Sequence, residues 1–223
     1  MRMKKAMAAM LAAAITVSSA LSVFAAATSP TTAPDASSDA SSYIDKNEEL
    51  HTGNEVTSTI NAGNTAATAV AATGDSTKAG SAVEFKNATT EEGKNVPITV
   101  IGNGKKGVFD SKAGRKIKTL TVNSSAKKVT VKAKAFTNSK VKTVKVATKK
   151  LVINKNAFKG TKQKKIVVSF QKGHKKAAAL TVKKDAFEDV TKITVKGLSK
   201  KQFKKLRTKL VKAGVKKSAI KRG

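Results

Sequence analysis

The side chains that most often perform catalysis or hold metals are scarce in this chain of 223 residues. It contains no Cys and two His, His51 and His174, which lie in different segments of the sequence. Without thiols, the chain cannot use disulfides, iron–sulfur clusters or a thiol nucleophile, and nothing in the spacing brings the two imidazoles together on a metal. No Ser and Asp pattern suited to nucleophilic catalysis accompanies His174. The sequence therefore predicts a protein that is not an enzyme and that uses no cofactor or metal.

Two motifs imitate functional sites. Residues 102–107 match the pattern G-x-G-x-x-G, but a dinucleotide site needs a helix to begin there and an acidic residue about twenty positions later. Because Lys127 occupies that later position, we predict an ordinary turn. Asp185, Glu188 and Asp189 lie close together without a partner base or nucleophile, so we predict that they are solvated turn residues.

Lysine dominates the second half of the chain, and its positive charge indicates binding of anions. The formal net charge is +31, and residues 28–96 hold ten acidic and four basic residues, whereas residues 97–223 hold four acidic and 38 basic residues. Such an excess of positive charge repels itself, and a polyanion would relieve that repulsion. Arg is rare and no exposed aromatic platform is expected, so we predict only non-specific contact with nucleic acid.

The N-terminal part of the sequence predicts export and a spacer. Three basic residues among the first five precede an apolar, Ala-rich run that ends in small residues at Ala25 and Ala27, as in a cleavable secretion signal. The length of the run leaves a retained membrane anchor as the alternative. We predict a signal peptide over residues 1–27 and a disordered acidic spacer over residues 28–96, since side chains larger than Ala are too sparse there to offset the entropy of ordering. The alternative for the end of this range is an isolated strand over residues 81–86, with order beginning there instead of at residue 97.

The basic part contains internal repeats. Residues 129–136, 151–158 and 180–187 each show two alternating apolar residues, three polar residues and then Ala-Phe. A second alternating pattern lies between these segments. Alternation with a period of two indicates short strands with one buried face, and a repeat this short must stack on its neighbours to cover its apolar side. We therefore expect parallel sheets and an internal ladder formed by Phe136 and Phe158, with Phe187 as its next member.

The Ala-Phe turn followed by x-V-K-T-V-K-V resembles the BspA-type leucine-rich repeats of bacterial surface proteins, over about residues 97–223. Together with the repeats, this resemblance implies a β-rich, leucine-rich-repeat-like solenoid of about four coils over residues 97–198. It also implies that the protein acts at the cell surface as a binding or adhesion module.

Residues 199–223 are expected to form a helical cap on the last coil. Ser199 and Gln202 have the spacing of a capping box, with Leu198 and Phe203 at the positions of a hydrophobic staple. Gly214 can end the helix in the left-handed conformation. A helix lying on a membrane surface is the alternative for this basic segment.

Stacking would align the lysines of successive repeats into columns. Parallel strands lie about 4.8 Å apart, so aligned lysines repel one another and attract a polymer of opposite charge. The predicted polyanion-binding residues are Lys118, Lys142, Lys145, Lys164, Lys165 and Lys192. The expected partner is a cell-wall polymer, an acidic polysaccharide or a surface protein. We then expect the protein to be secreted as a monomer, with association with the cell wall as a further location. In the alternative, it is a structural spacer without a dedicated ligand, and the lysines provide solubility and protect sheet edges.

Overall fold

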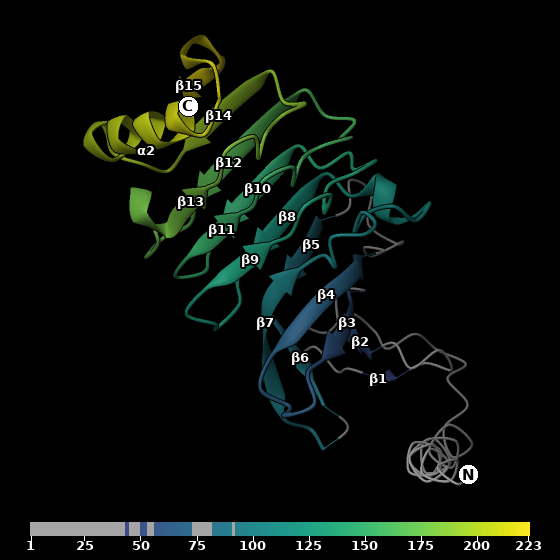
Figure 1. Cartoon of the computed structure of the whole chain (residues 1–223). Helices are drawn as coiled ribbons and strands as arrows, with labels where there is room; N and C mark the ends of the chain where they lie inside the picture. Colours follow the sequence, from purple (N-terminus) through teal and green to yellow (C-terminus); the bar gives the residue numbers. More distant parts are fainter. Residues whose placement is uncertain (1–42, 45–49, 53–55, 73–81, 91) are drawn as a thin grey trace, which may run out of the picture. The chain divides into compact units, whose positions relative to one another are not determined.

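The computed structural model describes residues 43–44, 50–52, 56–72, 82–90 and 92–223 (Figure 1). These residues form two sheets. Sheet A has nine strands in the order β1-β2-β3-β4-β7-β9-β11-β13, with β6 paired to β7, and sheet B has six strands in the order β15-β14-β12-β10-β8-β5. The predicted signal peptide, residues 1–27, lies outside the described residues.

The strands of sheet A are β1 (Tyr43–Ile44), β2 (Leu50–Thr52), β3 (Val56–Ile60), β4 (Ala67–Ala72), β6 (Asn87–Thr89), β7 (Asn95–Ile101), β9 (Val129–Val131), β11 (Leu151–Ile153) and β13 (Leu180–Val182). The strands of sheet B are β5 (Ala82–Phe85), β8 (Thr119–Val122), β10 (Thr143–Val146), β12 (Lys165–Phe170), β14 (Lys192–Lys196) and β15 (Ile220–Arg222). The helical elements are the short 3-10 helices η1 (Gly114–Lys116), η2 (Ala177–Ala179) and η3 (Lys217–Ala219) and the α-helix α2 (Lys200–Lys212).

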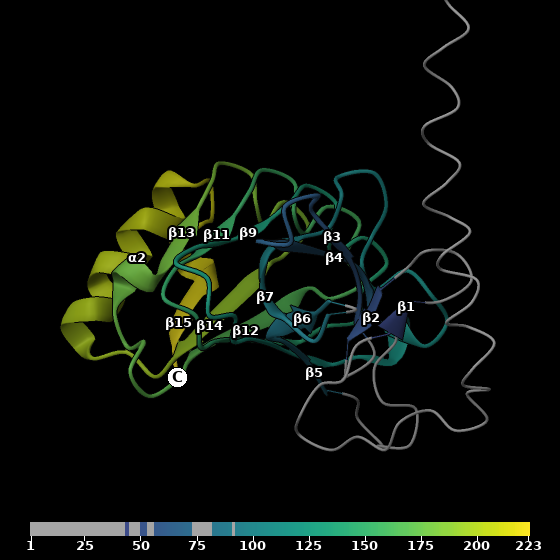
Figure 2. The ribbon, with the colours of Figure 1, turned by 90° about the horizontal axis from the view of Figure 1, so that it is seen from below.

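From β7 to β14 the chain alternates between the two sheets, and each strand pairs in parallel with its equivalent in the next repeat. Figure 2 shows the strands of the two sheets on opposite sides of the interior. The alternating sequence explains the arrangement, because every second side chain of β8 and β10 is buried and those between are partly exposed. Buried side chains of both sheets belong to one apolar core.

A ladder of stacked phenylalanine rings runs through this core. The ring centroids of Phe136 and Phe158 are 4.0 Å apart with planes inclined by 5°, and those of Phe158 and Phe187 are 4.6 Å apart. The ladder continues through Phe109, at 5.4 Å from Phe136, to Phe85, at 6.1 Å from Phe109. The stacking predicted for the three Ala-Phe turns is therefore confirmed, and the structure adds Phe85 and Phe109 as further members.

The predicted leucine-rich-repeat-like solenoid of about four coils, preceded by a long disordered segment, is wrong. The described residues instead form two sheets with one C-terminal α-helix, and sheet A mixes parallel pairing with the antiparallel pairs β1–β2, β2–β3, β3–β4 and β6–β7. Several of these strands come from residues 28–96, which the composition assigned to a spacer. The remaining residues of that range lie outside the described part of the chain.

The error has an identifiable physical origin in β3 and β4. Val56, Ala67, Ala69 and Ala72 are at most 1 % exposed, although three of the four are too small to have counted toward a core in the composition argument. Because β4 pairs with β7, this segment extends a sheet that already exists and orders its backbone through ladder hydrogen bonds. Small side chains suffice where a neighbouring sheet supplies most of the apolar surface.

The predicted C-terminal helix is present as α2, which packs against η2 and β13. The Ser199 hydroxyl accepts a hydrogen bond from the Gln202 N–H at 3.3 Å, as an N-cap residue does. The reciprocal half of the expected capping box is replaced, because the Gln202 Oε1 accepts from the Ala177 N–H instead, at 2.9 Å. Gly214 follows the helix with a φ of +93°, as predicted. Among the described residues, no helix is long and apolar enough to cross a membrane.

Candidate anion-binding surfaces

The structure brings together some of the predicted polyanion-binding lysines and separates others. Lys165 and Lys192 begin β12 and β14 and lie directly beside each other in the parallel register, as the sequence predicted. Lys142 follows Lys118 in the neighbouring repeat, where the Lys142 N–H donates to the Lys118 carbonyl at 2.8 Å. Lys145 lies on the outer side of β10, between the buried Val144 and Val146, in register with Thr121 on one side and Ser169 on the other.

Lys164 does not continue the column of Lys118 and Lys142. In the register of β10 and β12, Val144 lies beside Val168, whereas a column of Lys118, Lys142 and Lys164 requires Val144 to lie beside Ile166. Since both Ile166 and Val168 are apolar and buried, the sequence pattern alone could not distinguish the two registers. The two-residue displacement moves Lys164 away from the position beside Lys142.

A more strongly cationic surface lies at the turns that follow four strands of sheet A. Its polar side chains come from the turns after β7, β9, β11 and β13, and together they line a groove of about 640 Å³. We call this surface the turn groove; its argument depends on Asn103, Lys132, Asn154, Lys155, Lys183 and Lys184.

Backbone hydrogen bonds hold these turns in a regular stack. The Lys132 N–H donates to the Ile101 carbonyl at 2.9 Å, the Asn154 N–H to the Val131 carbonyl at 3.1 Å, and the Lys183 N–H to the Ile153 carbonyl at 2.9 Å. The first residue of each turn therefore lies beside its equivalent in the next turn, with the spacing of parallel strands, about 4.8 Å. The turn geometry is shared, because Lys134, Asn156 and Asp185 all adopt left-handed conformations with φ between +58° and +60°.

Few acidic groups balance this charge. Lys155 Nζ lies 3.9 Å from Asp185 Oδ2, and both side chains are well exposed, at 68 % and 37 %, so this pair contributes little. Lys132, Lys183 and Lys184 form no ion pair within the part of the chain that the structure describes. With amide groups from Asn103 and Asn154 beside them, these ammonium groups provide hydrogen-bond donors and positive charge for carboxylate, sulfate or phosphate oxygens.

The two motifs that imitate functional sites are turns, as predicted. Gly102 and Gly104 have positive φ values of +85° and +82°, and the chain after them contains turns rather than a helix N-terminus. The acidic residues near Phe187 connect neighbouring repeats: Asp189 Oδ2 accepts from the Gly160 N–H at 2.6 Å, and Glu188 Oε2 lies 3.7 Å from Lys159 Nζ.

The residues of the turn groove were missed as site residues, although the sequence contained their signal. Apart from Asn103, they occupy the run of three residues between the alternating strand residues and Ala-Phe in each repeat. Because equivalent positions of this run alternate between Lys and Asn, as in Lys132, Asn154 and Lys183, the sequence shows no column of lysines there.

Comparison with known proteins assigns no family. No family model matches the chain, and neither a curated protein nor a solved structure matches it. The inference about function therefore depends on the surfaces of the molecule.

Proposed function

We propose that this protein is a binding module for a linear anionic polymer outside the cell, and that the turn groove is its main contact surface. The observation that carries the proposal is that Lys132, Lys155, Lys183 and Lys184 line one groove, and that among the described residues they form one ion pair, between the exposed groups of Lys155 and Asp185. The extracellular location follows from the pattern of a secretion signal at residues 1–27.

The geometry favours an extended ligand. Equivalent turn residues repeat at about the spacing of parallel strands, with Lys132, Asn154 and Lys183 at the first turn position. Lys155 and Lys184 follow at the second position, so cations from three repeats are spread across the strand direction. A polymer with regularly spaced charges satisfies several lysines at once, and each added contact raises the local concentration of the next. A small anion would meet only one or two of them.

Lysine side chains select a ligand by its density of negative charge more than by its shape. Lys presents a hydrated point charge on a flexible stem, whereas the planar fork of Arg suits paired recognition of phosphates and base edges. The groove contains Lys and no Arg. We therefore expect binding to acidic polysaccharides and wall polymers according to their charge density, with strong salt dependence.

The alternative assigns the lysines to solubility and to protection of sheet edges. The last strand of sheet B, β15, contains the exposed Lys221 and Arg222, and charged residues on an edge strand discourage pairing with other chains. Under this alternative, all exposed lysines are equivalent, and removing any two has the same effect on polyanion binding.

A matched pair of variants distinguishes polymer binding in the turn groove from a general role of the lysines in solubility. K183Q/K184Q removes two adjacent exposed lysines of the turn groove, and K204Q/K205Q removes two adjacent exposed lysines of α2. With heparin oligosaccharides and purified wall teichoic acid as probes at about 0.15 M salt, we expect the groove variant to bind about fivefold more weakly or worse. The helix variant should remain within about twofold of the parent. Equal losses in the two variants, or release of the parent protein from both probes near 0.1 M salt, would contradict the proposal.

A further inference from the structure

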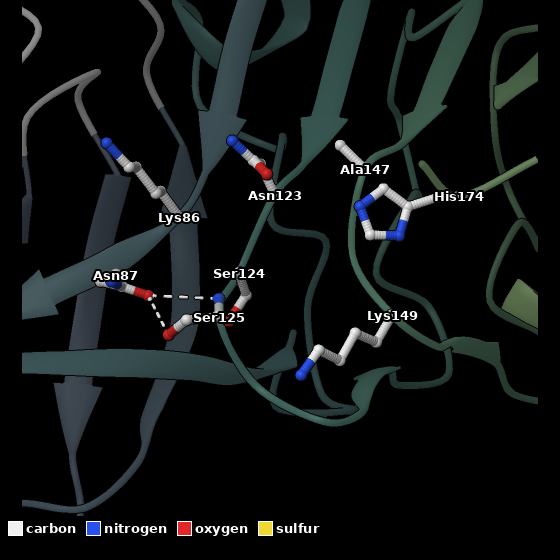
Figure 3. A pocket seen from close by; sticks show the side chains of 8 residues that line it. All are labelled: Lys86, Asn87, Asn123, Ser124, Ser125, Ala147, Lys149 and His174. Carbon is white, nitrogen blue, oxygen red and sulfur yellow. Dashed lines mark hydrogen bonds between the residues drawn. The ribbon is translucent and has the colours of Figure 1, made fainter. Parts of the chain in front are cut away.

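A second hollow lies at the edge of sheet B where its parallel strands end. Its lining comes from the loops after β5, β8, β10 and β12, and its volume is about 300 Å³, near the lower limit for small-molecule sites. We call it the carboxyl-edge pocket; the side chains used below are Lys86, Asn87, Asn123, Ser125, Lys149 and His174 (Figure 3). It shares no residue with the turn groove.

Hydrogen bonds hold the loops that form the wall of this pocket in fixed positions. The buried Thr148 hydroxyl donates to the Ser124 carbonyl at 3.1 Å, and the Ser124 hydroxyl accepts from the Ala126 N–H at 3.2 Å. Asn87 Oδ1 accepts from the Ser125 hydroxyl at 3.0 Å, which joins the loop after β8 to β6. The loops that line the pocket are therefore positioned before any ligand arrives.

Three basic side chains from three different loops surround the pocket. Lys86, Lys149 and His174 follow β5, β10 and β12 (Figure 3). Among the described residues, the lining includes no carboxylate; Glu84 Oε1, outside the lining, accepts a hydrogen bond from Nδ2 of the lining residue Asn123 at 2.6 Å. The pocket thus combines positive charge with the amide and hydroxyl groups of Asn87 and Ser125.

We propose that the carboxyl-edge pocket binds a single acidic sugar unit: a hydroxylated ring that carries a phosphate, sulfate or carboxylate group. The lysines and the imidazole attract the anionic group, while amide and hydroxyl groups pair with ring hydroxyls. A volume of about 300 Å³ has room for one such unit. This site recognises a terminal or isolated residue, and it is independent of polymer binding in the turn groove.

The test uses the full-length protein and the imidazole protons as a direct probe. Because the chain has two histidines, the variant His51→Gln identifies the nuclear magnetic resonance signals of His174. At constant ionic strength, glucose 6-phosphate should shift these signals in a saturable manner. Inorganic phosphate should act at least fivefold more weakly, and glucose should produce no saturable shift. Glucuronate tests whether a carboxylate replaces the phosphate.

Charge-matched variants provide the control. Lys149→Gln should raise the apparent dissociation constant for glucose 6-phosphate at least fivefold, while Lys140→Gln, an exposed lysine outside both surfaces, should change it less than twofold. Superimposable amide spectra for the two variants show that each remains folded. The proposal is overturned if no saturable shift occurs, if inorganic phosphate binds as tightly as the sugar phosphate, if glucose binds as tightly, or if the two variants lose affinity equally.

Discussion

At the scale of single residues, Gly197 shows how closely neighbouring repeats approach one another. It follows β14 with a φ of +81°, and a Cβ at this position would collide with the carbonyl oxygen of Phe170 at the end of β12. Gly173 has a similar φ of +86°, but a Cβ there meets no atom within 4 Å. Both positions require a left-handed backbone conformation, but only Gly197 also lacks space for a Cβ atom.

The corresponding prediction compares Gly197→Ala with Gly173→Ala. A side chain in the left-handed region costs about 1–2 kcal/mol, so we expect Gly173→Ala to destabilise by about that amount. Gly197→Ala should cost clearly more, because the new methyl group must also displace the backbone of β12. Urea unfolding followed by circular dichroism measures both, and equal losses of unfolding free energy would show that the collision is relieved without cost.

At the scale of elements, Asp110 joins η1 to the Ala-Phe turn of the next repeat. Asp110 Oδ1 accepts from Arg115 Nη2 in η1 at 2.7 Å and from Asn138 Nδ2 in the next repeat at 2.8 Å. The hydrogen bond from Arg115, with that from Asn138 and the guanidinium charge, lowers the pKa of Asp110 below its ordinary value. The carboxylate form is thus favoured by the folded state.

This pKa shift determines how the contribution of Asp110 to the unfolding free energy changes with pH. A carboxyl group whose pKa is lower in the folded state stabilises the fold above its unfolded pKa, about 3.9, and the contribution disappears as the pH falls through the folded value. We therefore expect the parent protein to exceed Asp110→Asn in unfolding free energy at pH 7, with the difference shrinking below about pH 4. Urea midpoints of both proteins at pH 7, 4, 3 and 2 test this. A difference that stays constant over the series would mean that the charge of Asp110 does not contribute.

At the scale of the whole molecule, self-repulsion among the lysines opposes folding. The chain carries a formal net charge of +31, and only three ion pairs are present between side chains of the described residues, each between partly exposed groups. Stability therefore comes mainly from the continuous core and the stacked rings of Phe85, Phe109, Phe136, Phe158 and Phe187.

Screening should then stabilise the protein. Raising sodium chloride from about 0.01 M to about 0.15 M shortens the Debye length from about 30 Å to about 8 Å, so we expect the melting temperature to rise. A polyanion that binds the folded state should raise it further, because the unfolding free energy increases with the logarithm of one plus the ratio of free polyanion concentration to dissociation constant. Differential scanning calorimetry tests both effects. A melting temperature that falls or stays constant with salt would show that the lysines are arranged so that repulsion is negligible.

The sequence by itself determined the local structure of the repeats and the end of the chain. Alternating apolar residues defined β8, β9, β10, β12 and β14, because each of these short strands buries every second side chain. The Ala-Phe pairs placed large rings at equivalent turns, and Ser199 marked the beginning of α2. These features depend on interactions within a repeat or between identical positions of adjacent repeats.

Only the tertiary structure decided the sheets as wholes and the surfaces that they create. The Ala-rich strand β4 orders because β7 offers it a sheet edge, and β3 pairs with β4 in turn, which no local pattern encodes. The register of β12 depends on which of two apolar residues lies beside Val144. The turn groove and the carboxyl-edge pocket combine loops from four successive repeats. Each of these features depends on contacts between residues far apart in sequence, and their pairing is set by packing rather than by the type of any one residue.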